Sequence, residues 1–196
     1  MGEKWWQFIY RIPADRNPLF DLTGAQCGVA QSGPVWILAS VVDPGGPATI
    51  DRSCTLPEGK ALLVSPGGTL NDFPCPAAFH FDSPPGVPLF DFLKDGIAPI
   101  VNSVNGIDIT VAGVAVATPF AYREQSRHLF EIEGDPSLAS VLDPCITGTP
   151  QPAFSDGYFT MLRPLAAGHH ELSIHATDTK GTDLTLNWHL NVMARH

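Results

Sequence analysis

The sequence predicts an all-β fold: a single antiparallel β-sandwich of jelly-roll type over residues 1–196, with one or two short peripheral helices. Three observations predict it. Short apolar or alternating stretches recur along the chain, 19 prolines and 18 glycines punctuate them, and strands do not alternate with long helices. A chain of 196 residues is long enough to bury a core as one domain.

The first helix is expected at residues 3–12, before Pro13. Its apolar residues recur at helical spacing and predict one face packed on the sheet: Trp5, Phe8, Ile9 and Ile12. Trp6 and Tyr10 lie on an adjoining face. They either pack on the sheet like the others or form a stacking platform for a ligand.

Strands are expected next. Residues 33–42 (GPVWILASVV) form a continuous apolar run rich in β-branched residues, which predicts a strand buried on both faces. Residues 43–46 (DPGG) predict a turn after it. Residues 48–56 and 60–66 predict two further strands, joined by Pro-Glu-Gly.

Residues 66–88 are rich in proline and glycine and predict a long irregular excursion, tethered through Cys75. Ordered loops of this kind on a rigid scaffold often carry function. The second helix is expected at residues 88–101, with a proline in its first turn. Gly96 and Pro99 are expected to break its C-terminal end.

Short apolar stretches at residues 106–120, 128–134 and 156–165 predict further strands. The chain closes with a predicted hairpin over residues 168–192, whose last strand alternates apolar and polar residues with a period of two. The loop at residues 179–181 places glycine where a type I turn with a bulge needs a left-handed residue.

The register of this hairpin decides where four histidines point. Placing Leu172 opposite Trp188 puts every apolar residue of both strands on one face. His170 then lies opposite Leu190 and points inward, and His189 is expected to form a charge pair with Glu171. The remaining histidines do not converge with His170, so no metal site is expected: His169, His175 and His189.

Two interpretations of His170 stay open. In the first, it is a structural histidine bonded to the main chain of the turn at residues 164–168. In the second, it reaches a site beside Asp156 and Tyr158, whose strand would pair with its own.

Other polar residues offer weaker candidate sites. Glu131 and Glu133 share one face of a strand and suit acid and base roles in glycoside chemistry, although a solvated strand has the same pattern. Asp156 and Tyr158 lie either side of a glycine that predicts a bulge. His128 is a further catalytic candidate, and Tyr158 joins Trp6 and Tyr10 as a candidate ligand-binding residue.

Composition excludes several classes of function. Eleven basic and twenty acidic residues give a formal net charge of −9, which repels nucleic acid. The longest apolar runs are too short to span a bilayer. Nucleotide, phosphate and zinc-protease motifs are missing from the sequence, so no cofactor is expected. A structural calcium or transition metal remains a weaker alternative.

The four cysteines predict two disulfides and therefore an oxidising compartment. The preferred pairing is Cys27 with Cys54, which flank a strand and its return, and Cys75 with Cys145, which both lie in irregular segments. Four cysteines allow three pairings, so the others stay open. Residues 1–11 lack the apolar region of a signal peptide. If the protein is secreted or periplasmic, Met1 and Gly2 are expected to stand before a mature chain.

Several sequence blocks resemble one family of uncharacterised secreted proteins, mostly bacterial and partly fungal, whose mature chains begin with Trp-Trp-Gln. The blocks include KWWQFIYRIPADRNPLFD, RSCTLPEGKALLVSP, YREQSRHLFEI and DGYFTMLRPLAAGHHELSIHATD. The resemblance covers nearly the whole chain and implies export with removal of a leader. It implies no activity and no catalytic residue.

Two function classes follow. The first is a secreted binding or interaction protein, with a small molecule or a carbohydrate as the favoured ligand. The second is a secreted hydrolase or lyase whose carboxylates, histidine and tyrosine come from separate strands. A β-sandwich hosts both, so the predicted fold does not choose between them.

Overall fold

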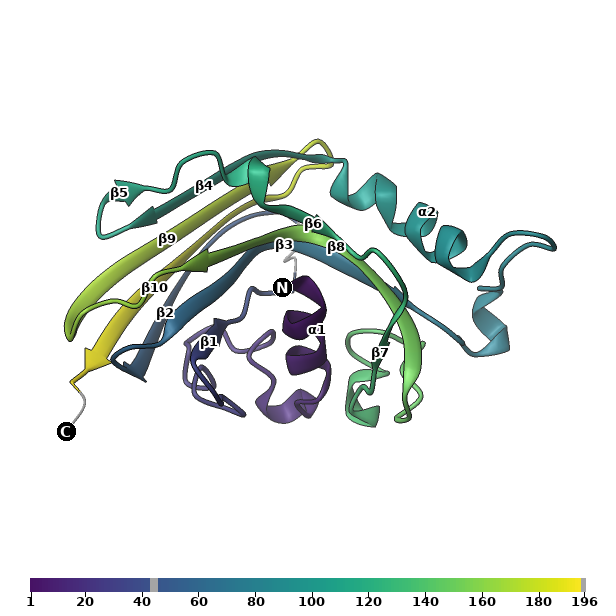
Figure 1. The fold of residues 1–196 in the computed structure, drawn as a ribbon, viewed down its shortest axis with the longest axis horizontal. Coiled ribbons are helices and arrows are strands. Elements are labelled where there is room, and N and C mark those ends of the chain that lie inside the picture. The colour runs from purple at the N-terminus through teal and green to yellow at the C-terminus, as the bar shows by residue number, and fades with distance from the viewer. Residues whose placement is uncertain (43–45, 195–196) are drawn as a thin grey trace.

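The structure, a computed structural model, describes residues 1–42 and 46–194; most of the turn predicted at residues 43–46 therefore lies outside the described residues. The described strands form two sheets (Figure 1). Sheet A has the order β1 (Val35–Leu38), β3 (Ala61–Asp72), β8 (Gln151–Leu162), β6 (Arg123–Gln125), with β7 (Phe130–Ile132) also paired to β8. Sheet B has the order β2 (Pro47–Pro57), β10 (Asp183–Met193), β9 (Gly168–Asp178), β4 (Val104–Val111), β5 (Val114–Ala115).

The predicted all-β fold is confirmed, with two short α-helices, α1 (Gly2–Tyr10) and α2 (Leu89–Val101). The described residues also form short 3₁₀ turns: η1 (Ala14–Arg16), η2 (Ala77–Phe79), η3 (Pro119–Tyr122) and η4 (Pro136–Leu138). Most strand pairs are antiparallel, as expected. Two are parallel, β1 with β3 and β2 with β10, so both sheets are mixed.

The main core lies between the two sheets, as in a sandwich. Side chains of both sheets build it: Leu62, Val64, Tyr158, Leu162, Leu172, Ile174, Leu186 and Trp188. The other face of sheet A is also covered, because α1 packs there through Trp5 and Ile9 against Leu63 and Phe159. Successive side chains of β3 and β8 point to opposite faces of sheet A, and both faces of these strands are therefore buried.

The two helices lie on opposite faces of sheet A (Figure 1). Helix α1 occupies the concave face, so it is more central than the expected peripheral helix. Helix α2 packs on Phe154 through Leu93 and Ile97. It continues past Gly96 and Pro99 to Val101, so the predicted break is wrong. Buried side chains at four-residue spacing hold the last turn in place.

Two strand predictions need correction near β1. The segment at residues 33–42 forms only the four-residue β1, which is a half-buried edge strand rather than a strand buried on both faces. The excursion predicted from residue 66 begins later, because β3 continues to Asp72 through a register shift between Val64 and Gly67. The predicted bulge therefore lies in β3 and not beside Gly157.

The predicted hairpin register is confirmed in β9 and β10, where Leu172 pairs with Trp188 and His170 with Leu190. Glu171 and His189 also pair as predicted, with 2.9 Å between a carboxylate oxygen and Nδ1. The hydrogen bond to Glu171 raises the pKa of His189. The register could be predicted because only one pairing of the two strands puts all their apolar side chains on the core face.

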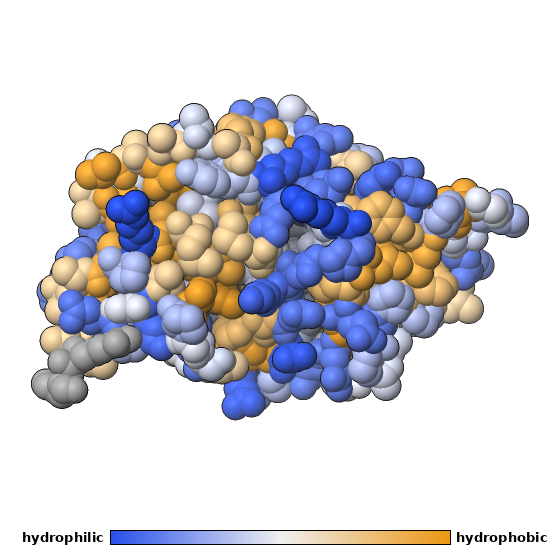
Figure 2. Space-filling view, viewed as in Figure 1, coloured by the Kyte–Doolittle hydropathy of each residue, from blue (hydrophilic) through white to orange (hydrophobic). Residues whose placement is uncertain are grey.

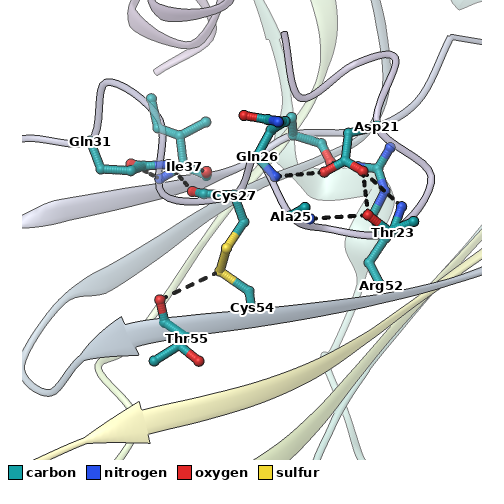
Figure 3. Close-up of a disulfide and its surroundings, with 11 residues drawn as sticks. Asp21, Thr23, Ala25, Gln26, Cys27, Gln31, Ile37, Arg52, Cys54 and Thr55 are labelled. Carbon is teal, nitrogen blue, oxygen red and sulfur yellow. Dashed lines mark hydrogen bonds between the residues drawn. A yellow bond between two sulfur atoms is a disulfide. The ribbon is translucent and has the colours of Figure 1, made fainter. Parts of the chain in front are cut away.

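Both preferred disulfides are present, Cys27–Cys54 and Cys75–Cys145. Figure 3 shows the first of them, with Asp21 and the buried Arg52 close by. Arg52 donates to the main-chain oxygens of Ala39 and Ser40, at 2.9 and 3.1 Å. Burial lowers its pKa to about 10, partly offset by the charge of Asp21. The guanidinium also lies 5.2 Å from the ring centroid of Trp188.

The outer surface mixes polar and apolar residues. On the face shown in Figure 2, apolar residues gather where α2 lies and also on the opposite side of the molecule, where β4 and β5 lie. Three side chains at the start of this helix are only half-buried: Leu89, Phe90 and Phe92. Among the described helices, none is long and apolar enough to cross a membrane.

Candidate functional site

A cavity of about 450 Å³ runs along one edge of β3. Strand β1 pairs with β3 only from Ala61 to Val64, and the β3 residues beyond, Ser65–Asn71, line the cavity. Helix α1 and the loop at Leu142 and Asp143 form one wall. The tip of the β9–β10 hairpin and the α2–β4 connection form the opposite wall: Ile100, Val104, Ala176, Thr177, Asp178, Thr182 and Leu184.

The wall on α1 is aromatic. Trp5 and Trp6 meet edge to face, with ring centroids 4.8 Å apart and planes at 81°. Trp6 and Tyr10 do the same at 5.7 Å and 80°. Trp6 and Tyr10 are four residues apart in the helix and therefore share one face. The sequence singled out this pair, and the structure places both in the cavity wall while they also pack in the core.

Three titratable groups meet beside this wall: Tyr10, Asp72 and Asp143. Tyr10 Oη donates to Asp143 Oδ2 at 3.1 Å, and the main-chain N–H of Cys145 donates to Asp143 Oδ1 at 2.9 Å. Gln151 Nε2 donates to Asp72 Oδ2 at 2.8 Å. Each carboxyl group is thus held in place by at least one hydrogen bond.

Asp72 has a strongly raised pKa. Asp72 is 1% exposed, and burial, then the charge of Asp143 and a hydrogen bond to it, raise the pKa of Asp72 to about 8. Burial and the same two carboxyl groups raise the pKa of Tyr10 well above its usual value. The raised pKa favours the protonated form of Asp72 at neutral pH, because two carboxylates this close cannot both ionise cheaply.

The second disulfide brings these carboxyl groups together. Asp72 ends β3 three residues before Cys75, and Asp143 lies two residues before Cys145. Neither aspartate was predicted from the sequence. The preferred pairing of Cys75 with Cys145 could have pointed to them, because it brings the two segments that contain them together.

This cluster is a poor metal site. Among the described residues, the potential ligand atoms of Asp72, Asp143 and Cys145 lie within 4.8 Å of one another. The sulfur of Cys145 is in a disulfide and is not available as a thiolate. Two carboxyl oxygens remain, and one carboxyl group holds a proton, which leaves too few ligands for zinc or calcium.

The predicted pair Asp156 and Tyr158 is buried, and both residues make contacts within the protein. Arg123 binds the fully buried Asp156 in a two-pronged contact, Nε to Oδ1 at 2.9 Å and Nη2 to Oδ2 at 2.6 Å. Gln125 adds a bond of 3.0 Å to the same carboxylate. Tyr158 packs in the core between the sheets, edge to face with Phe120 at 5.5 Å. Neither residue lines the β3 cavity.

The structural interpretation of His170 is supported, because its Nε2 lies 2.8 Å from the main-chain oxygen of Ala166 in the predicted turn. The pairing proposed in the other interpretation is wrong. Strand β9 pairs with β10 and β4 in sheet B, whereas Asp156 and Tyr158 lie on β8 in sheet A. The chain crosses between sheets at residues 163–167, and sequence order alone does not reveal that crossing.

The remaining candidates lie apart from the cavity. Glu131, Glu133 and His128 are exposed, and none of them lines it. His175 lies on the outer face of sheet B, where its Nε2 is 2.9 Å from Asp183 Oδ1. A second hollow of about 590 Å³ lies on the other face of α1, and its lining includes Lys4 and Arg11 but no Asp, Glu or His.

Comparisons with known proteins give no family. No family model and no curated protein matches the chain. Two solved structures were found. "Structure of PbICP-C in complex with falcipain-2" matches 80% of this chain and 98% of that chain with 8% identity and a TM-score of 0.33. "Solution Structure of Amebosin" matches 76% and 100% with 12% identity and a TM-score of 0.21. Both likenesses are too weak to inform fold or function.

Proposed function

We propose that the protein is a secreted or periplasmic binding protein that takes a small molecule or part of a glycan into the cavity beside β3. One observation carries the proposal: a space of about 450 Å³ has an aromatic wall on α1 with the carboxyl group of Asp143 beside it. Ligand sites in proteins are typically clefts of about 300–1,000 Å³, mostly apolar, with a few polar groups that orient the ligand.

The edge of β3 adds polar groups of a second kind. Beyond Val64 no described strand pairs with this edge, so main-chain groups of residues 65–71 face the cavity side of the strand. A hydroxyl or amide of a ligand can bond there while its apolar body packs on Trp6 and Tyr10.

Location outside the cytoplasm is part of the proposal. Two disulfides support it, because such bonds persist in oxidising compartments. Membership of the secreted Trp-Trp-Gln family, proposed from the sequence blocks alone, points the same way.

Gly67→Leu is expected to abolish ligand binding without unfolding the protein. Gly67 lines the cavity, and a Cβ atom there would meet no atom within 4 Å, so the leucine side chain grows into open space. Binding is measured by NMR with a library of small neutral and charged compounds, following the indole signals of Trp5 and Trp6.

Gly28→Leu is the matched control, since Gly28 also has open space around it and does not line the cavity. Compounds that shift the wild type and Gly28→Leu alike, but not Gly67→Leu, support the proposal. Equal binding to all three proteins, or no binding to the wild type, would refute it.

A hydrolase or lyase is the second candidate. The observation that favours it is the carboxyl pair Asp72 and Asp143 beside Tyr10, in which burial and Asp143 raise the pKa of Asp72 to about 8. Paired carboxyl groups with separated proton affinities can supply an acid and a base. Incubating each bound compound with the protein distinguishes the two classes, because an enzyme converts the compound over time and a binding protein returns it unchanged.

A further inference from the structure

The charge of the cavity is one-sided. Its described lining holds the acidic residues Asp143 and Asp178 and no lysine, arginine or histidine. Burial pushes the pKa of Asp178 up, but hydrogen bonds from the main chain of Thr182 and Lys180 hold it below its usual value. Asp178 is therefore ionised at neutral pH.

One buried cation, Arg52, lies behind the cavity wall. Arg52 does not line the cavity. Its Nη1 donates to the main-chain oxygens of Ala39 and of the lining residue Ser40, and its guanidinium lies against Trp188 in the core between the sheets. The whole chain has a formal net charge of −9, so the field outside the cavity also attracts cations.

The aromatic wall favours the same kind of ligand. The face of an aromatic ring is negative and its edge is positive. Trp5, Trp6 and Tyr10 pack edge to face on one another and are mostly buried, so a ligand contacts only the parts of these rings that line the cavity. An ammonium group over the face of a tryptophan or tyrosine ring is attracted by the negative face of that ring.

We propose that the cavity binds a small organic cation, an amine or a quaternary ammonium compound whose charged group lies between the α1 aromatic rings and Asp143. This inference rests on the proposed function, which places the ligand in the same cavity. An anion is disfavoured, because no cationic side chain in the described lining would balance its charge after it leaves water.

Choline and its neutral isostere 3,3-dimethyl-1-butanol test the charge directly. They have nearly the same shape, so a cavity that only takes up apolar groups binds both alike. We expect calorimetry on the wild type to show choline bound at least about tenfold more tightly, which corresponds to about 1.4 kcal/mol. Equal affinity for the two compounds would overturn the cation assignment while leaving the cavity a binding site.

Asp143→Asn is expected to weaken choline binding by about tenfold and to leave the binding of 3,3-dimethyl-1-butanol unchanged. Asparagine retains an acceptor for Tyr10, so the wall keeps its geometry. The matched control is Asp95→Asn on α2, because that carboxylate is exposed and lies outside the cavity lining. Choline affinity that survives Asp143→Asn but falls in Asp95→Asn would contradict the proposal.

The trimethylammonium group occurs in free small molecules and in lipid headgroups, so sedimentation with phosphatidylcholine vesicles forms a second arm. Binding of free choline without sedimentation assigns the site to free cations. Sedimentation that Asp143→Asn abolishes assigns the same cation chemistry to a lipid headgroup. If neither choline nor any other compound binds, the proposed function fails together with this inference.

Discussion

The free energy of unfolding is expected to fall by about 1.4 kcal/mol for each pH unit between pH 5 and pH 7. The cause is Asp72, whose pKa is raised to about 8 in the folded protein by burial and by Asp143. In the unfolded chain its pKa is about 3.9. Between these values the folded state keeps a proton that the unfolded state has lost. Stability from this group is therefore fully present below about pH 4 and is lost as the pH rises toward 8.

Other shifted groups do not reverse this slope. Asp21 and Asp178 have lowered pKa values, so their contribution is lost only in acid, below the window. The raised pKa of His189 acts in the same direction as Asp72, because its proton is also lost as the pH rises. Urea unfolding at pH 5, 6, 7 and 8, with both disulfides intact, measures the slope.

Asp72→Asn should remove most of the slope, since an amide can donate to Asp143 and accept from Gln151 without titrating. The variant is expected to be more stable than the wild type at pH 8 by several kcal/mol, on the order of the full shift. Asp95→Asn serves as the control and should keep the wild-type slope. A wild-type stability that is flat or rising from pH 5 to pH 7 would show that Asp72 is ionised in the folded protein.

Arg123→Met is expected to destabilise the protein by about 3 kcal/mol, because it leaves the buried carboxylate of Asp156 without its partner. The carboxylate is fully buried, whereas a third of the arginine side chain is exposed, so the expected loss lies at the low end for a buried pair. Arg123 also bonds to Asn102 Oδ1 at 2.9 Å, and that contact is lost too. Guanidinium unfolding at pH 7 measures the change.

The double variant Arg123→Met with Asp156→Leu should recover much of this stability, because it removes the stranded charge as well. Arg127→Met, four residues along in an exposed position, is the control and should change stability by less than about 0.5 kcal/mol. If Arg123→Met unfolds like the control, the ion pair between Arg123 and Asp156 does not contribute the stability assigned to it.

Part of the candidate site could be predicted from the sequence, and part could not. Helical spacing alone placed Trp6 and Tyr10 on one face of α1, and that face forms the cavity wall. The preference for Cys75 with Cys145 was also correct. The step from that pairing to the carboxyl pair was missed, because Asp72 and Asp143 have no shared motif and meet only when segments 71 residues apart come together.

Local patterns indicated most of the strands, both helices and the β9–β10 register, because alternation, turn residues and helical spacing act between residues that are close in sequence. Tertiary contacts decided the rest. The parallel pairing of β2 with β10, the crossing of the chain from β8 to sheet B, and the early end of β1 depend on which distant segments meet. The open edge of β3, and with it the cavity, exists because β1 stops after four residues. The apolar run of residues 33–42 cannot show this, since its hydrophobic pattern does not depend on where its partner strand ends.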